Sequence, residues 1–157
     1  MRIGQGYDSH RFEEGRRLLL GGVEISGHIG LKGHSDADVL VHAVIDSLFG
    51  AACLGNIGSH FPDTDAAYKN VSSLKLLSVA AEKVAKAGFS IVNIDTTVVC
   101  ETPRLQEYVD SMCQAMADAA GISRRQISVK GKTNELMDDV GAKVGIVAYS
   151  VCLLEEK

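Results

Sequence analysis

The chain has 157 residues, of which 46% are hydrophobic and 23% charged, with a formal net charge of −4, so residues 1–157 are expected to form a single domain with a buried core. This balance offers no basic field for nucleic acid, and a bound phosphate must be held by a metal, by backbone N–H groups or by a few cations. No run approaches the roughly 20 apolar residues of a membrane span, and the first residues lack the apolar core of a secretion signal, so a cytoplasmic protein without a membrane partner is expected.

Two strand candidates open the chain. Residues 6–12, GYDSHRF, are predicted to be a strand in which Asp8 and His10 share one face, because alternate side chains of a strand point the same way. Residues 16–25, RRLLLGGVEI, form a second candidate, and the two adjacent glycines inside it mark a bulge or bend.

A buried helix and a long loop follow. Residues 35–55 begin with a capping signature, Ser35 followed three residues later by Asp38, and then carry apolar residues on nearly every side. Residues 55–71 are rich in Gly, Asp and Asn, which predicts a loop. That loop is long for a compact domain, so a functional role is expected for it.

The second half alternates between helices and strands. Residues 72–88 are predicted to form an amphipathic helix, and residues 89–101 a strand rich in β-branched side chains. The next helix is predicted to have Thr102 as its N-cap, Pro103 at its first position and Gly121 at its end.

Strands at residues 127–133 and 143–154 close the chain. The interleaving predicts an α/β fold, with helices on one face of a mixed sheet. Apolar residues on both faces of the strands at 90–94 and 146–154 leave the other face exposed, and oligomerisation is the natural way to cover it.

A cluster of metal-ligand types lies in the first half. Asp8 and His10 share a strand face, and Asp38, His42 and Asp46 follow one another at four-residue spacing along a helix. Two imidazoles and one carboxylate would leave an open fourth position, as in catalytic zinc sites, and the same set suits non-haem iron. The plainer interpretation is a buried core histidine beside a surface ion pair.

Three further segments could bind an anionic substrate. His34 and Ser35 precede the predicted helix, where free N–H groups attract anions, although a simple cap explains them equally. Residues 130–135, KGKTNE, combine cations, a hydroxyl and a carboxylate that could hold a phosphate and a divalent ion, or form a solvated turn. Residues 61–65, FPDTD, could be a flap or an ordinary turn.

The motifs of the chain occur in a characteristic order: GYDSHRF, LLLGGVEI, GLKGHSDADVLVHAVIDSLFGAACLGNIGSHFPDTD, ETPRL and KTNE. In this succession the chain resembles the 2-C-methyl-D-erythritol 2,4-cyclodiphosphate synthases, enzymes of the non-mevalonate isoprenoid pathway. The resemblance covers nearly the whole chain, and its most specific parts are the D-x-H pair and the GHSDADVL segment with the histidine and aspartate that follow it.

The resemblance implies a homotrimer whose sheets face the threefold axis and whose three active sites lie between adjacent subunits. Asp8, His10 and His42 would bind one zinc ion per active site, and Glu135 would hold a magnesium or manganese ion that bridges the substrate phosphates. In the implied reaction the 2-phosphate of 4-diphosphocytidyl-2-C-methyl-D-erythritol 2-phosphate attacks the β-phosphorus of its own diphosphate and expels CMP.

The resemblance also implies roles for other residues. His34 and Thr133 would act in catalysis by steadying the transition state. Cytosine would bind residues 100–106 at a helix N-terminus, ribose would lie beside residues 46, 56 and 58, and residues 61–65 would close over the methylerythritol. The implied substrate contacts are Ser9, Ser35, Asp46, Asn56, Ile57, Gly58, Phe61, Pro62, Asp63, Thr64, Asp65, Cys100, Glu101, Thr102, Pro103, Arg104, Leu105, Gln106, Lys132 and Asn134.

The sequence departs from the family pattern at several positions. Asn56 replaces the usual Asp, Arg104 the usual Lys, and residues 131–132 are Gly-Lys in place of Ala-Thr. Ala142 and Val144 stand where many members have Arg and Glu, residues that line the central cavity of the trimer and are implicated in holding an isoprenoid diphosphate. Such ligands are therefore expected to bind poorly here.

Two other functions are compatible with parts of this pattern. A non-haem iron oxygenase would use the same two histidines and one carboxylate, and would depend on dioxygen. A non-catalytic trimeric module that binds zinc and nucleotide would bind without turnover, and the changes at residues 56 and 131–132 are the only features that favour it.

Overall fold

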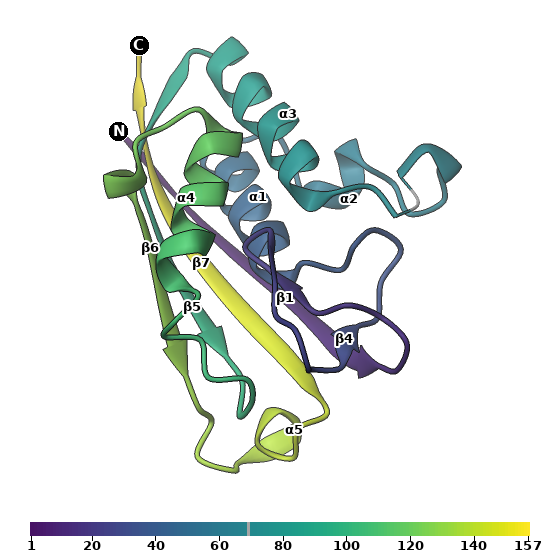
Figure 1. The fold of residues 1–157 in the computed structure, drawn as a ribbon. Helices are drawn as coiled ribbons and strands as arrows, with labels where there is room; N and C mark the ends of the chain where they lie inside the picture. The colour runs from purple at the N-terminus through teal and green to yellow at the C-terminus, as the bar shows by residue number, and fades with distance from the viewer. Residues whose placement is uncertain (69) are drawn as a thin grey trace.

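A computed structural model describes residues 1–68 and 70–157 and contains a five-stranded mixed sheet with its helices on one face (Figure 1). The strands of this sheet are β1 (Arg2–Glu13), β4 (Gly30–Leu31), β5 (Phe89–Val99), β6 (Ile127–Lys132) and β7 (Gly145–Glu156). Their order is β4-β1-β7-β5-β6, and only β5 and β6 run parallel. A small separate pair consists of β2 (Leu19–Leu20) and β3 (Val23–Glu24). The predicted α/β class and mixed sheet are confirmed.

The helices are α1 (Val39–Ala51), α2 (Ile57–His60), α3 (Ser73–Lys86), α4 (Val109–Ala120) and α5 (Asp138–Gly141), with 3-10 turns at Ala66–Tyr68 and Arg124–Gln126. Helix α1 packs against β1 and β7 on one side and against α3 on the other, so its apolar surface is buried nearly all round. The predicted buried helix is confirmed. Among the described residues, the helices are all too short or too polar to cross a membrane.

Two glycines let α1 lie directly on β1. A Cβ atom at Gly6 would lie 1.9 Å from the carbonyl oxygen of Ala43, and one at Gly4 would lie 2.0 Å from that of Ser47. Any larger residue would push the helix away from the strand. This close approach brings His42 of α1 next to the side chains of β1.

The start of the first helix differs from the prediction. Helix α1 begins at Val39 and its N-cap is Asp38, whose carboxylate accepts a hydrogen bond from the Val41 N–H. The predicted N-cap, Ser35, lies in the preceding turn and accepts from the Ala37 N–H. Both side chains can cap, and Asp38 prevails because it is buried and also binds the N–H groups of the glycine turn between β2 and β3.

Two predicted segments are more finely divided than expected. The strand predicted at 16–25 is the β2–β3 pair, because its two glycines adopt positive φ angles and reverse the chain. The loop predicted at 55–71 contains α2 and a 3-10 turn, and residue 69 of that prediction lies outside the described residues. Asn56 caps α2 by accepting from the Ser59 N–H at 2.9 Å, a helix cap that the sequence pattern did not reveal.

The helix predicted to begin at Thr102 and Pro103 begins at Val109, so that prediction was wrong. The chain leaves β5 with a hydrogen bond from the Cys100 N–H to the Lys132 carbonyl, and then buries Pro103 and Leu105 before the helix starts. Burial of these apolar side chains outweighs the local N-terminal signal. The predicted end at Gly121 is confirmed, because this residue is the left-handed C-cap of α4.

The second face of the sheet carries exposed apolar side chains. Ile3, Tyr7, Tyr149 and Val151 point away from the helices and are 74%, 49%, 43% and 40% exposed. The rings of Tyr7 and Tyr149 are cross-strand neighbours with centroids 5.3 Å apart. The predicted one-sided covering of the sheet is therefore confirmed for the single chain.

Candidate metal centre and active site

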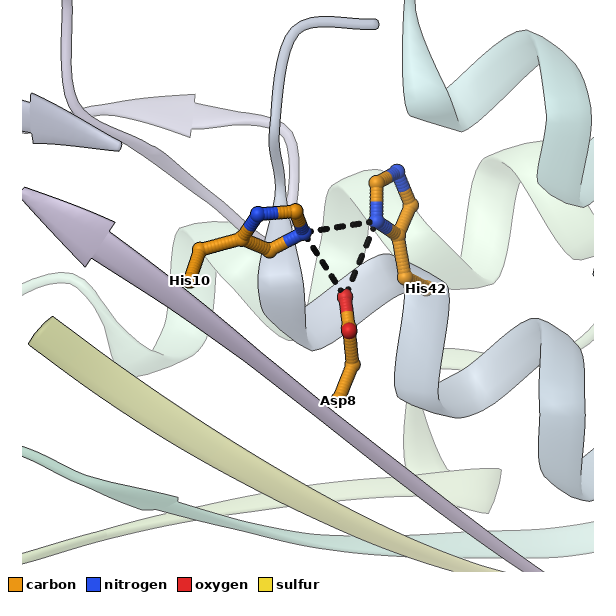
Figure 2. A group of neighbouring side chains, drawn as sticks. All are labelled: Asp8, His10 and His42. Atoms are coloured by element: carbon orange, nitrogen blue, oxygen red, sulfur yellow. Dashed lines mark hydrogen bonds and ion pairs between the residues drawn. The ribbon is translucent and has the colours of Figure 1, made fainter. Parts of the chain in front are cut away.

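Asp8, His10 and His42 converge on one point between β1 and α1 (Figure 2). The Asp8 Oδ2 atom lies 2.9 Å from His10 Nε2 and 3.0 Å from His42 Nδ1, and the two ring nitrogens are 3.3 Å apart. The alternation of β1 places the first two side chains on its helix-facing side, and the glycine-mediated contact supplies the third.

This geometry fits a tetrahedral metal ion. Metal–ligand bonds of about 2.0–2.1 Å at tetrahedral angles place ligand atoms about 3.3 Å apart, close to the three separations observed. The outer nitrogen of His10, Nδ1, lies 2.6 Å from the Lys32 carbonyl, which can only accept, so the neutral ring donates there and turns the lone pair of Nε2 inward. The group therefore offers two nitrogen ligands and one oxygen ligand, with space left for a fourth.

The electrostatics of the cluster favour bound positive charge. Burial acts to raise the pKa of Asp8, but hydrogen bonds and charge from His10 and His42 outweigh it and lower that pKa to about 2. Burial acts to lower the pKa of His10, and the hydrogen bond and negative charge of Asp8 outweigh it and raise it. Asp46 has a raised pKa, chiefly because it is partly buried. At neutral pH Asp8 is thus a carboxylate.

The cluster opens into a cavity of about 480 Å³. Many residues assigned by resemblance line it: His34, Ser35, Asp46, Ile57, Gly58, Phe61, Pro62 and Asp63, beside the three metal-type ligands. Tyr68 and Leu76 line it as well and were missed by sequence reasoning. Tyr68 contacts Phe61 edge to face at 5.5 Å between ring centroids. Leu76 belongs to the apolar stripe of an amphipathic helix, a pattern that indicates core packing alone.

Some predicted contacts also make structural hydrogen bonds, and others lie beside or outside this cavity. The Asp46 carboxylate accepts from the Ile57 N–H at 2.7 Å, which ties α2 to α1. Asn56 uses its side-chain oxygen to cap α2, and Thr64 and Asp65 are exposed next to the cavity lining. The side chain of Ser9 lines a different cavity, because it points to the opposite face of β1 from the metal-type ligands.

A second group of predicted residues gathers at the far ends of β5 and β6. Thr133 donates a hydrogen bond to the Glu135 carboxylate at 2.9 Å, and the Glu101 carboxylate accepts from the N–H groups of Asn134 and Leu136 at 2.9 and 3.1 Å. Glu135 has a positive φ of 51°, a strained conformation for a non-glycine residue. Glu101 therefore holds this loop in shape, a role that the sequence did not suggest.

The predicted cytosine-binding segment, 100–106, adjoins this loop. The Cys100 thiol is buried and directed at the Pro103 carbonyl, and burial raises the pKa of that thiol to about 11, so it is inert. Arg104, Gln106 and Lys132 are exposed. Within the described part of the chain, neither 100–106 nor 132–135 contributes to the cavity above the metal-type cluster.

A larger cavity of about 760 Å³ lies on the helix-free side of the sheet, and part of its lining is shared with the cluster strand. Tyr7, Ser9, Arg11 and Tyr149 contribute to it, as does Val144 at the position of a departure from the family pattern. Because this cavity faces the open side of the sheet, its final shape depends on what covers that side.

Comparison with known proteins identifies the relatives of the chain. A 2-C-methyl-D-erythritol 2,4-cyclodiphosphate synthase from Laribacter hongkongensis is 52% identical over 157 residues, which cover 100% of this chain and 97% of the relative. The bifunctional IspDF from Campylobacter jejuni matches with a TM-score of 0.96 and 40% identity, and the match covers 99% of this chain and 42% of that larger one.

The IspF of Plasmodium falciparum, solved as a CDP complex, matches with a TM-score of 0.86 and 33% identity over 99% of this chain and 96% of that one. The sequence model of the YgbB family matches residues 1–155 of this chain. The chain therefore belongs to the YgbB family, whose curated relatives are 2-C-methyl-D-erythritol 2,4-cyclodiphosphate synthases.

Proposed function

We propose that this protein converts 4-diphosphocytidyl-2-C-methyl-D-erythritol 2-phosphate into 2-C-methyl-D-erythritol 2,4-cyclodiphosphate and CMP. An oxygen of the 2-phosphate forms a bond to the β-phosphorus, and the bond from the β-phosphorus to the oxygen of CMP breaks. The observation that carries this proposal is the convergence of Asp8, His10 and His42 beside a cavity, in a chain whose relatives of about 50% identity are cyclodiphosphate synthases.

Asp8, His10 and His42 would hold a zinc ion, for which two imidazoles, one carboxylate and an open position are a common catalytic set. When bound, such an ion polarises and orients phosphate oxygens. The reaction joins two anionic groups, so positioning and charge neutralisation are the main tasks, and a nucleophilic side chain is not required.

The cavity residues suit the sugar end of the substrate. Phe61, Tyr68 and Leu76 give it apolar lining, and Asp46 also lines it, with its second carboxylate oxygen available to a hydroxyl group. His34 also lines this cavity, and its Nε2 lies 3.3 Å from the Asp65 carbonyl oxygen, a contact that the ring would exchange for a phosphate oxygen. These positions support the roles that the family resemblance assigns.

The loop at the end of β6 suits the diphosphate end. Glu135 would offer a carboxylate to a magnesium or manganese ion, and Thr133 and Lys132 would offer a hydroxyl and a cation to the diphosphate. The neighbouring segment 100–106 would take the cytosine, through its backbone rather than the buried Cys100 thiol.

A homotrimer would unite these two groups. Each chain carries the metal-type cluster at one place and the 133–135 loop at another, and this loop does not line the cavity above the cluster. The exposed apolar face of the sheet, with Tyr7 and Tyr149 near its centre, is the kind of surface that subunit contacts bury. Each active site would then lie between two subunits, as the resemblance implies.

The direct test is turnover, followed by phosphorus NMR, with the diphosphocytidyl substrate, zinc and magnesium. Stoichiometric CMP and cyclic product are expected, with loss of activity in His42→Ala and unchanged activity in His28→Ala, a histidine exposed on a turn away from the cavity. Binding of zinc and CDP without turnover would refute the enzyme and favour the binding module. Turnover that needs iron and dioxygen would favour the oxygenase.

A further inference from the structure

Behind His42, on the side away from the metal-type cluster, lies a chain of polar side chains that the proposed reaction does not use directly. The second ring nitrogen, His42 Nε2, is 2.9 Å from the hydroxyl oxygen of Ser73, the first residue of α3. That hydroxyl in turn makes a short hydrogen bond to the Asp36 carboxylate, which also accepts from the Ser73 N–H at 2.8 Å. Ser73 is fully buried.

The direction of each hydrogen bond in this chain is fixed by chemistry. An ionised carboxylate only accepts, so the Ser73 hydroxyl donates its single hydrogen to Asp36. The oxygen of Ser73 then has only lone pairs left for His42, and a bond at 2.9 Å requires that Nε2 carry a hydrogen. Ser35, whose hydroxyl oxygen lies 3.2 Å from the same nitrogen, can accept from it as well.

We propose that Asp36 and Ser73 are positioning residues that hold His42 in the tautomer with hydrogen on Nε2, so that the Nδ1 lone pair faces Asp8 and His10. The opposite tautomer would place a hydrogen at Nδ1, where the metal ion belongs. This inference rests on the proposed metal site, and it assigns to two residues outside that site the task of preparing one of its ligands.

The two histidines are prepared in parallel but by different means. His10 is oriented by the backbone carbonyl of Lys32, which no substitution removes. His42 depends on side chains, and its partner belongs to α3 rather than to the helix that carries it. The loop of Asp36 and the start of α3 are thereby linked to the metal centre, and a disturbance of either reaches the ligand.

The test is zinc affinity, measured on the whole protein by competition with a chromophoric chelator. Ser73→Ala and Asp36→Asn are each expected to weaken zinc binding by about 10- to 100-fold, the range found when an outer partner of a metal-bound histidine is removed. The matched control is Ser72→Ala, since the neighbouring serine makes no capping hydrogen bond with its side chain and should bind zinc as the wild type does.

Two further readouts separate positioning from a general structural role. If Asp36 and Ser73 act through one chain of hydrogen bonds, the double variant should bind zinc no more weakly than the single variant of lower affinity. If each substitution damages the structure independently, the two losses of zinc affinity should add. In zinc-loaded wild type, proton–nitrogen NMR should show a proton on His42 Nε2 that is protected from exchange with water, and Ser73→Ala should lose that protection. The unfolding midpoint of metal-free Ser73→Ala should stay near that of metal-free Ser72→Ala.

Wild-type zinc affinity in Ser73→Ala would overturn the positioning role and leave the metal site intact. Additive losses in the double variant would also overturn it. A wild-type protein that fails to bind zinc would instead overturn the metal site, and the positioning role with it, so the two failures are distinguishable.

Discussion

Substitution of Gly6 by Ala tests how the fold builds the candidate metal centre. The added Cβ would lie 1.9 Å from the carbonyl oxygen of Ala43 in α1, and real contacts of this kind stay beyond 3.0 Å, so the strand and helix must separate by about 1 Å. Overpacking of this kind costs about 1–3 kcal/mol of stability. Metal–ligand distances tolerate only about 0.2 Å, so the shift between His42 and the β1 ligands is expected to weaken zinc binding about 100-fold.

The assay pairs urea unfolding with zinc competition. Gly50→Ala is the matched control, because a Cβ there meets nothing closer than 3.9 Å, and this helical glycine-to-alanine change should be neutral or stabilise the protein by up to about 1 kcal/mol. A Gly6→Ala protein with wild-type stability and wild-type zinc affinity would refute the link between this close contact and the metal site.

Three other changes have defined outcomes. The pKa of Asp8 in the folded protein, about 2, lies below its ordinary value of 3.8. The ionised carboxylate therefore stabilises the metal-free protein by about 2 kcal/mol above pH 3.8, and this contribution is lost as the pH falls toward 2. Urea unfolding midpoints measured across this pH range should show the loss in wild type and not in Asp8→Asn. Glu101→Ala leaves two N–H groups of the 134–136 loop unpaired and should weaken manganese binding at that loop about 10-fold by electron paramagnetic resonance, whereas unchanged binding would show that the carboxylate is dispensable. Farnesyl diphosphate should show no micromolar binding by calorimetry, because Ala142 and Val144 offer it no charge, and a micromolar dissociation constant would contradict this.

Much of the fold could be predicted because the periodic patterns were long. The buried helix, the amphipathic helix and the strands β5 and β7 each carry many apolar residues, so no single residue overrides the pattern. The errors lie where short signals compete. Asp38 and Ser35 can both cap a helix, and the capping signal at Thr102 was overridden by the burial of Leu105, a tertiary effect that local spacing does not encode.

The candidate site shows the same division. Asp8 and His10 could be placed on one face from strand alternation alone, and the addition of His42 needed the contact that Gly6 permits between β1 and α1. Ser73 could be predicted only as part of the helix at 72–88, because its hydrogen bond to His42 joins residues that are 31 positions apart in the sequence. The distance between the 133–135 loop and the cavity above the metal-type cluster depends on the arrangement of the whole sheet. The spacing of residues in the sequence does not predict it.

The proposal that each active site lies between two subunits is tested most directly by complementation between two inactive variants. His42→Ala damages the metal-type half and Glu135→Ala damages the loop half, so neither variant alone should turn over substrate. If the two halves of each site come from neighbouring subunits, trimers co-expressed from equal amounts of both variants contain intact sites at about one interface in four, and about a quarter of wild-type activity is expected. Mixed trimers with no activity would contradict a site between subunits.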